Sequence, residues 1–139
     1  MYRDDKDREI VECLKNNSRE SFVDIGKRMK LSESAIRKRV KNLVDGGTIR
    51  RFTIEMGDEN TTSAIVLVSV DSAVDTAGVS ARLAALEGIE TVYEITGQYD
   101  ITVIIGAPNI SRINSSIDAL RKIPGVTDTN TVIILKKVR

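Results

Sequence analysis

The sequence predicts an α+β fold in which a bundle of three short helices precedes an antiparallel sheet with its own helices. Two observations predict it. Apolar residues recur at helical spacing through residues 4–45, with cap residues between the periodic segments. After that, short continuous apolar runs alternate with helical patterns, and the whole unit repeats with an offset of 37 residues. The polar stretch 57–62 separates the two patterns, so we expect domains over residues 1–56 and 63–139 with 57–62 as linker.

Caps and apolar spacing predict the three helices of the first domain. Asp4, Ser21 and Ser32 are suitable N-caps, and an acidic residue follows each one within the first turn. The residues expected to face inward are Ile10, Cys13 and Leu14 in the first helix, Phe22, Ile25 and Met29 in the second, and Ile36, Val40, Leu43 and Val44 in the third. The alternation over Thr48–Ile54 predicts a strand that leaves the bundle, which gives a winged helix-turn-helix.

The second domain is expected to contain a duplicated β-α-β unit. The apolar runs at 65–70 and 102–107 read as its central strands. At the same offset of 37 residues, the positions Leu83, Leu86, Gly88 and Ile89 map onto Leu120, Ile123, Gly125 and Val126. Two such units in tandem predict the ferredoxin-like βαββαβ arrangement, a four-stranded antiparallel sheet with both helices on one face.

The other face of this sheet needs a cover. Both central runs are apolar at almost every position, which indicates strands that are buried on both faces. About 80 residues leave no third layer within the chain. We therefore expect the uncovered face to pack against a second copy in a symmetric homodimer that buries on the order of 1,600 Å².

Composition excludes several classes of function. The chain has no histidine and one cysteine, Cys13, which excludes most zinc sites and every Ser-His or Cys-His nucleophile. We expect no catalytic residues, no metal ligands and no cofactor. Cys13 lies on an inward stripe and is expected to be a small buried apolar residue, not a redox sensor. No stretch approaches the roughly 20 apolar residues that cross a bilayer, so we expect no membrane contact and a cytoplasmic protein.

Positive charge is concentrated in the first domain although the net charge is only +1. Residues 1–56 hold 14 Lys and Arg against 10 Asp and Glu, and residues 57–139 hold 7 against 10. On the third helix, the face opposite the apolar stripe carries Ser34, Arg37, Lys38 and Lys41. Such a face suits the major groove of DNA, where Arg and Lys reach guanine. From charge alone, a solvated basic face on an ordinary bundle is an equal alternative.

Several motifs together resemble the leucine-responsive/asparagine regulators, the Lrp/AsnC family. They are Asp4-x-x-Asp7-x-x-Ile10-Val11-x-x-Leu14, Arg19, Leu31-Ser32, Ile36-x-x-Arg39-Val40-x-x-Leu43, Gly47-Thr48-Ile49 and Gly97-Gln98-Tyr99-Asp100. The resemblance covers nearly the whole chain. It implies a transcription regulator whose helix-turn-helix binds double-stranded DNA. It also implies that the second domain dimerises, assembles further into tetramers or octamers, and senses an amino acid.

The exposed basic face gives the residues of the expected DNA site, and the resemblance implies those of the effector site. Base edges are assigned to Ser34, Arg37 and Lys38, and phosphates to Ser32, Arg39, Lys41, Arg50 and Arg51. In the family the effector lies between dimers, which here implies Gly97, Tyr99, Asp100, Thr129 and Thr131. Three segments depart from the family pattern: Ile25-Gly26 replaces Leu-Ala, Lys30 replaces a small residue, and Arg50-Arg51-Phe52 replaces Gly-aromatic.

Three alternatives stay open. An architectural DNA-binding protein without a ligand response would show broad, sequence-tolerant binding. A sensor that acts on protein partners would keep its activity without Arg37 and Lys38. A siroheme-decarboxylase-like enzyme has a similar bundle and αβ domain, but those enzymes rely on histidines, which this chain lacks.

Overall fold

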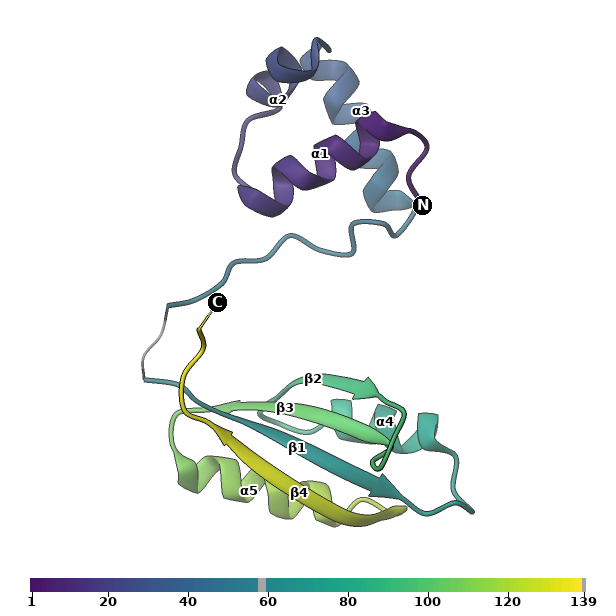
Figure 1. Ribbon diagram of the computed structural model, residues 1–139, viewed down its shortest axis with the longest axis vertical. Helices are drawn as coiled ribbons and strands as arrows, with labels where there is room; N and C mark the ends of the chain where they lie inside the picture. The colour runs from purple at the N-terminus through teal and green to yellow at the C-terminus, as the bar shows by residue number, and fades with distance from the viewer. Residues whose placement is uncertain (58–59, 139) are drawn as a thin grey trace. The chain divides into compact units, whose positions relative to one another are not determined.

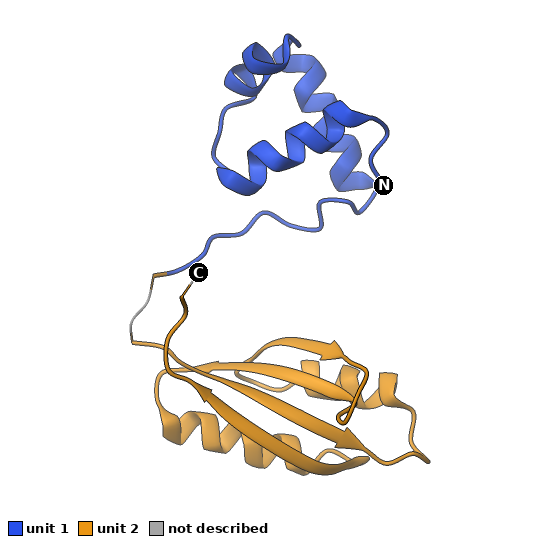
Figure 2. Cartoon of the chain, in the orientation of Figure 1, with its two compact units in different colours: residues 1–56 blue, residues 57–139 orange. Residues whose placement is uncertain are grey.

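The chain forms two compact units, residues 1–56 and 57–139 (Figure 2). The computed structural model describes residues 1–57 and 60–138. Two positions of the expected linker, Asp58 and Glu59, therefore lie outside the described residues, and Thr62, at the linker's end, already belongs to a strand. Each unit has its own cluster of buried apolar residues.

The first unit contains the three predicted helices, α1 (Asp5–Asn16), α2 (Phe22–Met29) and α3 (Glu33–Asp45) (Figure 1). The predicted N-caps are confirmed. The side chains of Asp4, Ser21 and Ser32 each accept a hydrogen bond from a backbone N–H in the first turn of their helix. Such caps satisfy donors that a helix start otherwise leaves without a partner, and they fix where each helix begins.

Two predictions about this unit are wrong. The predicted strand at 48–54 does not form, because residues 50–57 have no regular secondary structure and no strand lies beside them among the described residues of the unit. Alternating side chains do not make a strand without a neighbour to take its backbone hydrogen bonds. Phe52 and Ile54 are 54% and 74% exposed. Val44 is 42% exposed, because it lies just outside the buried stripe of Ile36, Val40 and Leu43.

The turn between α2 and α3 explains two departures from the family pattern. Lys30 ends α2 in the left-handed region, with φ of 54°, where a small residue is more usual. The next N–H, that of Leu31, donates to the Gly26 carbonyl at 2.8 Å. A Cβ at Gly26 would lie 2.5 Å from the Leu31 carbonyl oxygen, so the glycine permits this close turn.

The second unit is the predicted ferredoxin-like βαββαβ domain. Its elements are β1 (Thr62–Val70), α4 (Thr76–Ala84), β2 (Ile89–Glu94), β3 (Ile101–Ala107), α5 (Ile110–Arg121) and β4 (Val126–Ile134). The sheet order is β2-β3-β1-β4 and every pair is antiparallel. The internal repeat is visible in the structure. Leu83 and Leu120 are both fully buried, and Gly88 and Gly125 both have positive φ, at 82° and 99°.

The two faces of the sheet differ in burial. Both helices lie on one face (Figure 1), and alternate residues of β1 and β3 are buried beneath them. The intervening residues are half-buried, and among the described residues of this unit no helix covers them. Ile65 pairs with Ile104 on one side and with Val132 on the other, and Leu67 is the next residue of β1 on this side. We call the surface formed by Ile65, Leu67, Ile104 and Val132 the open face. Within one chain, the sheet is therefore buried on its helix-covered face only.

Candidate functional site

The surface of α3 that points away from the core is polar and basic. Ser34, Arg37, Lys38 and Lys41 are all exposed, whereas Ile36 on the opposite side is fully buried. Helical spacing places the four exposed residues on one face, because positions three and four apart are neighbours on a helix. We call these four residues the recognition face. Their side chains are short and polar near the helix start and long and cationic farther along.

Two of the cations on the recognition face have weak partners of their own. Arg37 forms an ion pair with Glu33, and its guanidinium lies 5.4 Å from the centre of the Phe22 ring. Lys41 pairs with Asp45. Exposed pairs at this helical spacing contribute about 0.3–0.5 kcal/mol each, so a phosphate or a guanine can replace the carboxylate at small cost. The Phe22 ring limits the orientations of Arg37, a contact that the sequence pattern does not indicate.

Ser32 is engaged as the cap of α3, because its Oγ accepts the Ala35 N–H at 3.2 Å. Ser34 Oγ lies 3.1 Å from Ser32 Oγ, at the positive end of the helix dipole. A phosphate placed there would meet free N–H groups and two hydroxyls. Arg50 and Arg51 are exposed in the segment that follows α3.

Arg39 differs from the other predicted phosphate ligands. Its Nη1 donates to Asp4 Oδ1 at 2.9 Å and to Asp7 Oδ1 at 2.7 Å, and its side chain is 27% exposed. Asp7 is the buried charged residue of this unit, with 3% of its surface exposed. The predicted phosphate contact of Arg39 therefore has no support in the structure. The sequence did contain a signal, since Arg39 follows buried Ile36 by three positions and precedes buried Leu43 by four.

The ion pair makes the first unit sensitive to acid. The Arg39 guanidinium, which donates to the carboxylate, is the main reason that the pKa of Asp4 lies below its usual 3.8. A lowered carboxyl pKa contributes stability that is complete above the unfolded value and is lost as pH falls through the folded value. We expect the melting temperature of the first unit to decline below about pH 4 and to decline less in Asp4→Asn, since asparagine keeps the cap without the charge. Thermal unfolding followed by circular dichroism at pH 2 to 6 measures both; equal slopes would contradict this.

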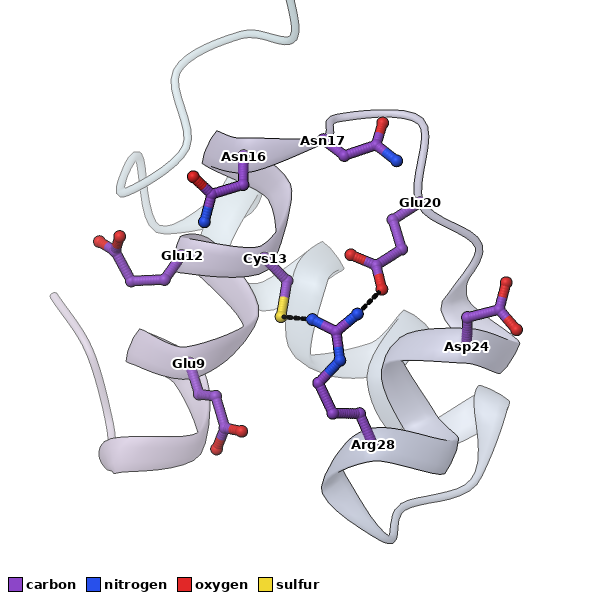
Figure 3. Close-up of a pocket in the computed structure, with 8 residues that line it drawn as sticks. All are labelled: Glu9, Glu12, Cys13, Asn16, Asn17, Glu20, Asp24 and Arg28. Carbon is purple, nitrogen blue, oxygen red and sulfur yellow. Dashed lines mark hydrogen bonds and ion pairs between the residues drawn. The ribbon is translucent and has the colours of Figure 1, made fainter.

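A pocket between α1 and α2 is acidic and does not suit DNA (Figure 3). Arg28 extends into it, pairs with Glu20 and donates from Nη1 to Cys13 Sγ at 3.1 Å. The other lining residues are Glu9, Glu12, Asn16, Asn17 and Asp24. Cys13 itself is 7% exposed and belongs to the core, as predicted. The surplus of carboxylates would repel phosphates, so within the first unit the basic surface of α3 is the better DNA contact.

The structure divides the residues expected to bind an effector between the two faces of the sheet: Thr129 and Thr131 lie opposite Val68 and Val66 on the helix-covered face, whereas Tyr99 contacts Asn130 of the other face. Asp100 precedes β3, and its Oδ2 accepts the Val70 N–H at the end of β1, at 2.7 Å. The Asp100 N–H donates to the Val68 carbonyl and its carbonyl accepts the Ile95 N–H, so this residue anchors the β2–β3 hairpin to β1. Asp100 thus has a structural role that its motif does not reveal, and its other carboxylate oxygen forms no hydrogen bond with the described residues.

Tyr99 and the two threonines approach the sheet from different sides. The Tyr99 hydroxyl accepts a hydrogen bond from Asn130 Nδ2 at 3.3 Å. Thr129 Oγ1 accepts from Arg121 Nε, at the end of α5, at 3.0 Å. The hydroxyl of Thr131 is buried without a hydrogen-bond partner among the described residues. In the hairpin, Gly97 has φ of 120°, and a Cβ at this position would meet no atom within 4 Å.

The described residues hold no group of three or more histidine, cysteine, aspartate or glutamate side chains arranged to bind a metal ion. No helix within the described ranges is long and apolar enough to cross a membrane. The functional groups that the structure does expose are basic and hydroxyl side chains on α3. Near the β2–β3 hairpin they are carboxylate and hydroxyl groups.

Each of the two units is similar to a domain of known proteins. An AsnC-type helix-turn-helix domain model matches residues 4–44, and a model of the Lrp/AsnC ligand-binding domain matches residues 63–139. The HTH-type transcriptional regulator LysM of Saccharolobus solfataricus is 47% identical over 133 residues, which cover 96% of this chain and 94% of the relative.

Solved structures share the fold at lower identity. A feast or famine regulatory protein from M. tuberculosis, complexed with L-methionine, has a TM-score of 0.88 at 24% identity and covers 98% of this chain and 94% of its own. A transcriptional regulator from Neisseria meningitidis in complex with L-Met has a TM-score of 0.85 at 24% identity, covering 99% and 93%. The relatives are named as regulators and not as enzymes, so the enzyme alternative is set aside. The chain belongs to the Lrp/AsnC family and is a helix-turn-helix DNA-binding transcription regulator.

Proposed function

We propose that the protein binds DNA through the recognition face of α3 and that an amino acid modulates this binding. Exposure of Ser34, Arg37, Lys38 and Lys41 on one side of α3 is the observation that carries the first half. Ser34, Arg37 and Lys38 would reach base edges in the major groove. Ser32, Lys41, Arg50 and Arg51 would contact phosphates on either side. DNA is the ligand, so we place the protein in the cytoplasm.

The working unit is a homodimer formed through the open face. Ile65, Leu67, Ile104 and Val132 are neighbours on a sheet face that no helix covers among the described residues of this unit, and apolar residues grouped on a surface in this way mark interaction sites. Packing two such faces together gives a two-fold axis, because the same patch serves both copies. A two-fold protein predicts a pseudo-palindromic DNA site with half-sites one or more helical turns apart. Assembly of dimers into tetramers or octamers follows from the family resemblance.

The effector is an amino acid held at the hairpin end of the sheet, between dimers. Two proteins with the same fold, those from M. tuberculosis and Neisseria meningitidis, are described as complexes with L-methionine, which supports an amino acid as the ligand class. In this chain, the second carboxylate oxygen of Asp100 suits an ammonium group. Thr129, whose hydroxyl accepts from Arg121, and Thr131, whose hydroxyl is buried without a partner among the described residues, lie on the helix-covered side of β4 and would reach a polar ligand from that side.

Selection of duplexes by the purified protein tests the whole proposal. Randomised duplex DNA is bound, recovered and sequenced without ligand and with each of the twenty amino acids at millimolar concentration. We expect a palindromic motif whose occupancy changes with one amino acid. Asp100→Asn, which keeps an oxygen to accept the Val70 N–H but loses the charge, should bind the motif and lose the response. Asp128→Asn, an exposed carboxylate on β4, is the matched control.

The other outcomes separate the remaining alternatives. A motif that responds to no amino acid would leave a DNA-binding regulator and reject the effector site. Salt-sensitive binding with no motif would favour an architectural protein. Absence of any salt-sensitive binding would reject DNA as the ligand and favour a protein partner.

A further inference from the structure

We propose that Arg39 is a positioning residue for DNA recognition: it does not contact DNA but fixes α3 through the buried carboxylate of Asp7. This inference rests on the proposed DNA contact of α3. The residue lies in the middle of the most basic helix, two positions after Arg37, where its charge suggests a phosphate ligand. Its contacts indicate a different role.

Helical spacing separates Arg39 from the recognition face. That face consists of positions 34, 37, 38 and 41, whereas Arg39 lies along the buried stripe beside Ile36 and Leu43. The guanidinium is directed toward the first turn of α1, where both of its ion-pair partners lie. An arginine that contacted phosphate in this geometry would first have to leave both carboxylates.

The pairing with Asp7 is costly to break. The Asp7 side chain is 4% exposed, and its two oxygens accept from Arg39 Nη1 at 2.7 Å and from the Arg3 N–H at 3.0 Å. A buried carboxylate that loses its cation is left without compensation in a medium of low dielectric constant. By contrast, an exposed arginine gains little by keeping a surface pair. The burial of Asp7 is therefore what holds Arg39 in place.

The pair joins two helices that otherwise meet through apolar contacts. Asp4 caps α1 with the same Oδ1 that accepts from Arg39, so the cap, the buried carboxylate and the middle of α3 share one network. Apolar packing is non-directional and tolerates small shifts, whereas two charge-assisted hydrogen bonds fix distance and angle. The network thus sets the tilt of α3 on the bundle and, with it, the direction of Arg37 and Lys38.

The test compares Arg39→Ala, Asp7→Asn and the double variant in the full-length protein. Two probes are used: the duplex that wild type selects from the randomised library, and poly(dI-dC) as non-specific DNA. Affinity is measured over a series of salt concentrations, and circular dichroism confirms that each variant is folded under the assay conditions. Lys38→Ala is the control that removes a predicted contact.

Positioning predicts that Arg39→Ala and Asp7→Asn each weaken binding to the selected duplex by about tenfold or more. The salt slope and the affinity for poly(dI-dC) stay at the wild-type values, and the double variant is no weaker than Arg39→Ala, because Arg39→Ala already removes the Arg39–Asp7 pair. A phosphate contact predicts instead that Arg39→Ala lowers the log-log salt slope by about 0.9, while Asp7→Asn leaves binding unchanged or tightens it.

A fall in salt slope on removing Arg39 overturns the inference, as does wild-type affinity in folded Arg39→Ala. If the alanine and asparagine variants do not fold, Arg39→Lys decides. Lysine ends one bond short of Nη1, so positioning predicts that Arg39→Lys binds the selected duplex more weakly with an unchanged salt slope. A phosphate contact predicts that Arg39→Lys keeps both the wild-type affinity and the wild-type salt slope. Wild-type protein that binds no duplex rejects the proposed function and this inference with it. Wild-type binding with a lowered slope in Arg39→Ala rejects this inference alone.

Discussion

The double variant Arg37→Ala, Lys38→Ala is expected to bind its selected duplex about 30-fold to 1,000-fold more weakly than wild type. Each side chain is exposed on the recognition face, and a good hydrogen-bonding pair to a base edge is worth about 1–3 kcal/mol of discrimination. Two independent pairs would sum to about 2–6 kcal/mol, but neighbouring side chains do not contribute additively, so removing both weakens binding by on the order of 2–4 kcal/mol. Because base contacts carry the specificity, binding to poly(dI-dC) should fall far less, and the motif recovered from a randomised library should become degenerate.

Arg50→Ala, Arg51→Ala provides the contrast, since these exposed arginines are assigned to phosphates. We expect it to weaken specific and non-specific binding alike and to lower the salt slope by roughly 0.9 for each phosphate that is no longer neutralised. Arg112→Ala, Lys122→Ala removes the same charge from exposed positions in the second unit and should change neither quantity. Wild-type specificity in Arg37→Ala, Lys38→Ala, measured by titration against both probes, would show that α3 does not read the bases.

Most of the fold could be predicted because its signals are local or periodic. A cap such as Ser21 or Ser32 acts within four residues, and a buried helical stripe follows the chain directly. The duplicated unit was detectable because Gly88 and Gly125 must both adopt positive φ at the same point of each repeat. The prediction of a strand at 48–54 was wrong because alternating apolar and polar side chains describe only the polarity of the segment. A strand forms only where another backbone pairs with it.

The sites were harder to predict because charge does not reveal partners. Arg37 and Arg39 both belong to the basic cluster of α3, yet one is exposed on the recognition face and the other is bonded to buried Asp7 from a different helix. Similarly, the motif around Asp100 indicated a ligand contact but not the hydrogen bond to Val70, which only the folded sheet brings into reach. Burial and long-range pairing decide such roles, and neither can be read from one segment alone.

Ile65→Asp is expected to convert the dimer into monomers. Ile65 lies at the centre of the open face, between Ile104 and Val132 on the neighbouring strands. A carboxylate there would meet its own copy across the two-fold axis and would lose its water without gaining a cation. Central residues of an interface cost about 2–4 kcal/mol when removed, and a buried charge adds to this, so the dimer dissociation constant should rise by at least about 30-fold.

The Ile65→Asp monomer should remain folded, so a change in its oligomeric state can be assigned to the lost interface. Ile65 is half-buried in the single chain and points away from the core beneath α4 and α5, so the aspartate would stay in water until a second copy arrives. Ile110→Asp is the control: it adds the same charge to the same unit, at an exposed position in the first turn of α5, where a negative charge is favourable. Sedimentation equilibrium should give a monomer for Ile65→Asp and a dimer or larger assembly for Ile110→Asp.

A monomeric Ile65→Asp should also lose affinity for a palindromic duplex far more than for an isolated half-site, because only the dimer holds two α3 helices at a fixed spacing. Dimers that persist in Ile65→Asp would show that the copies associate through another surface, and the open face would then need a different partner.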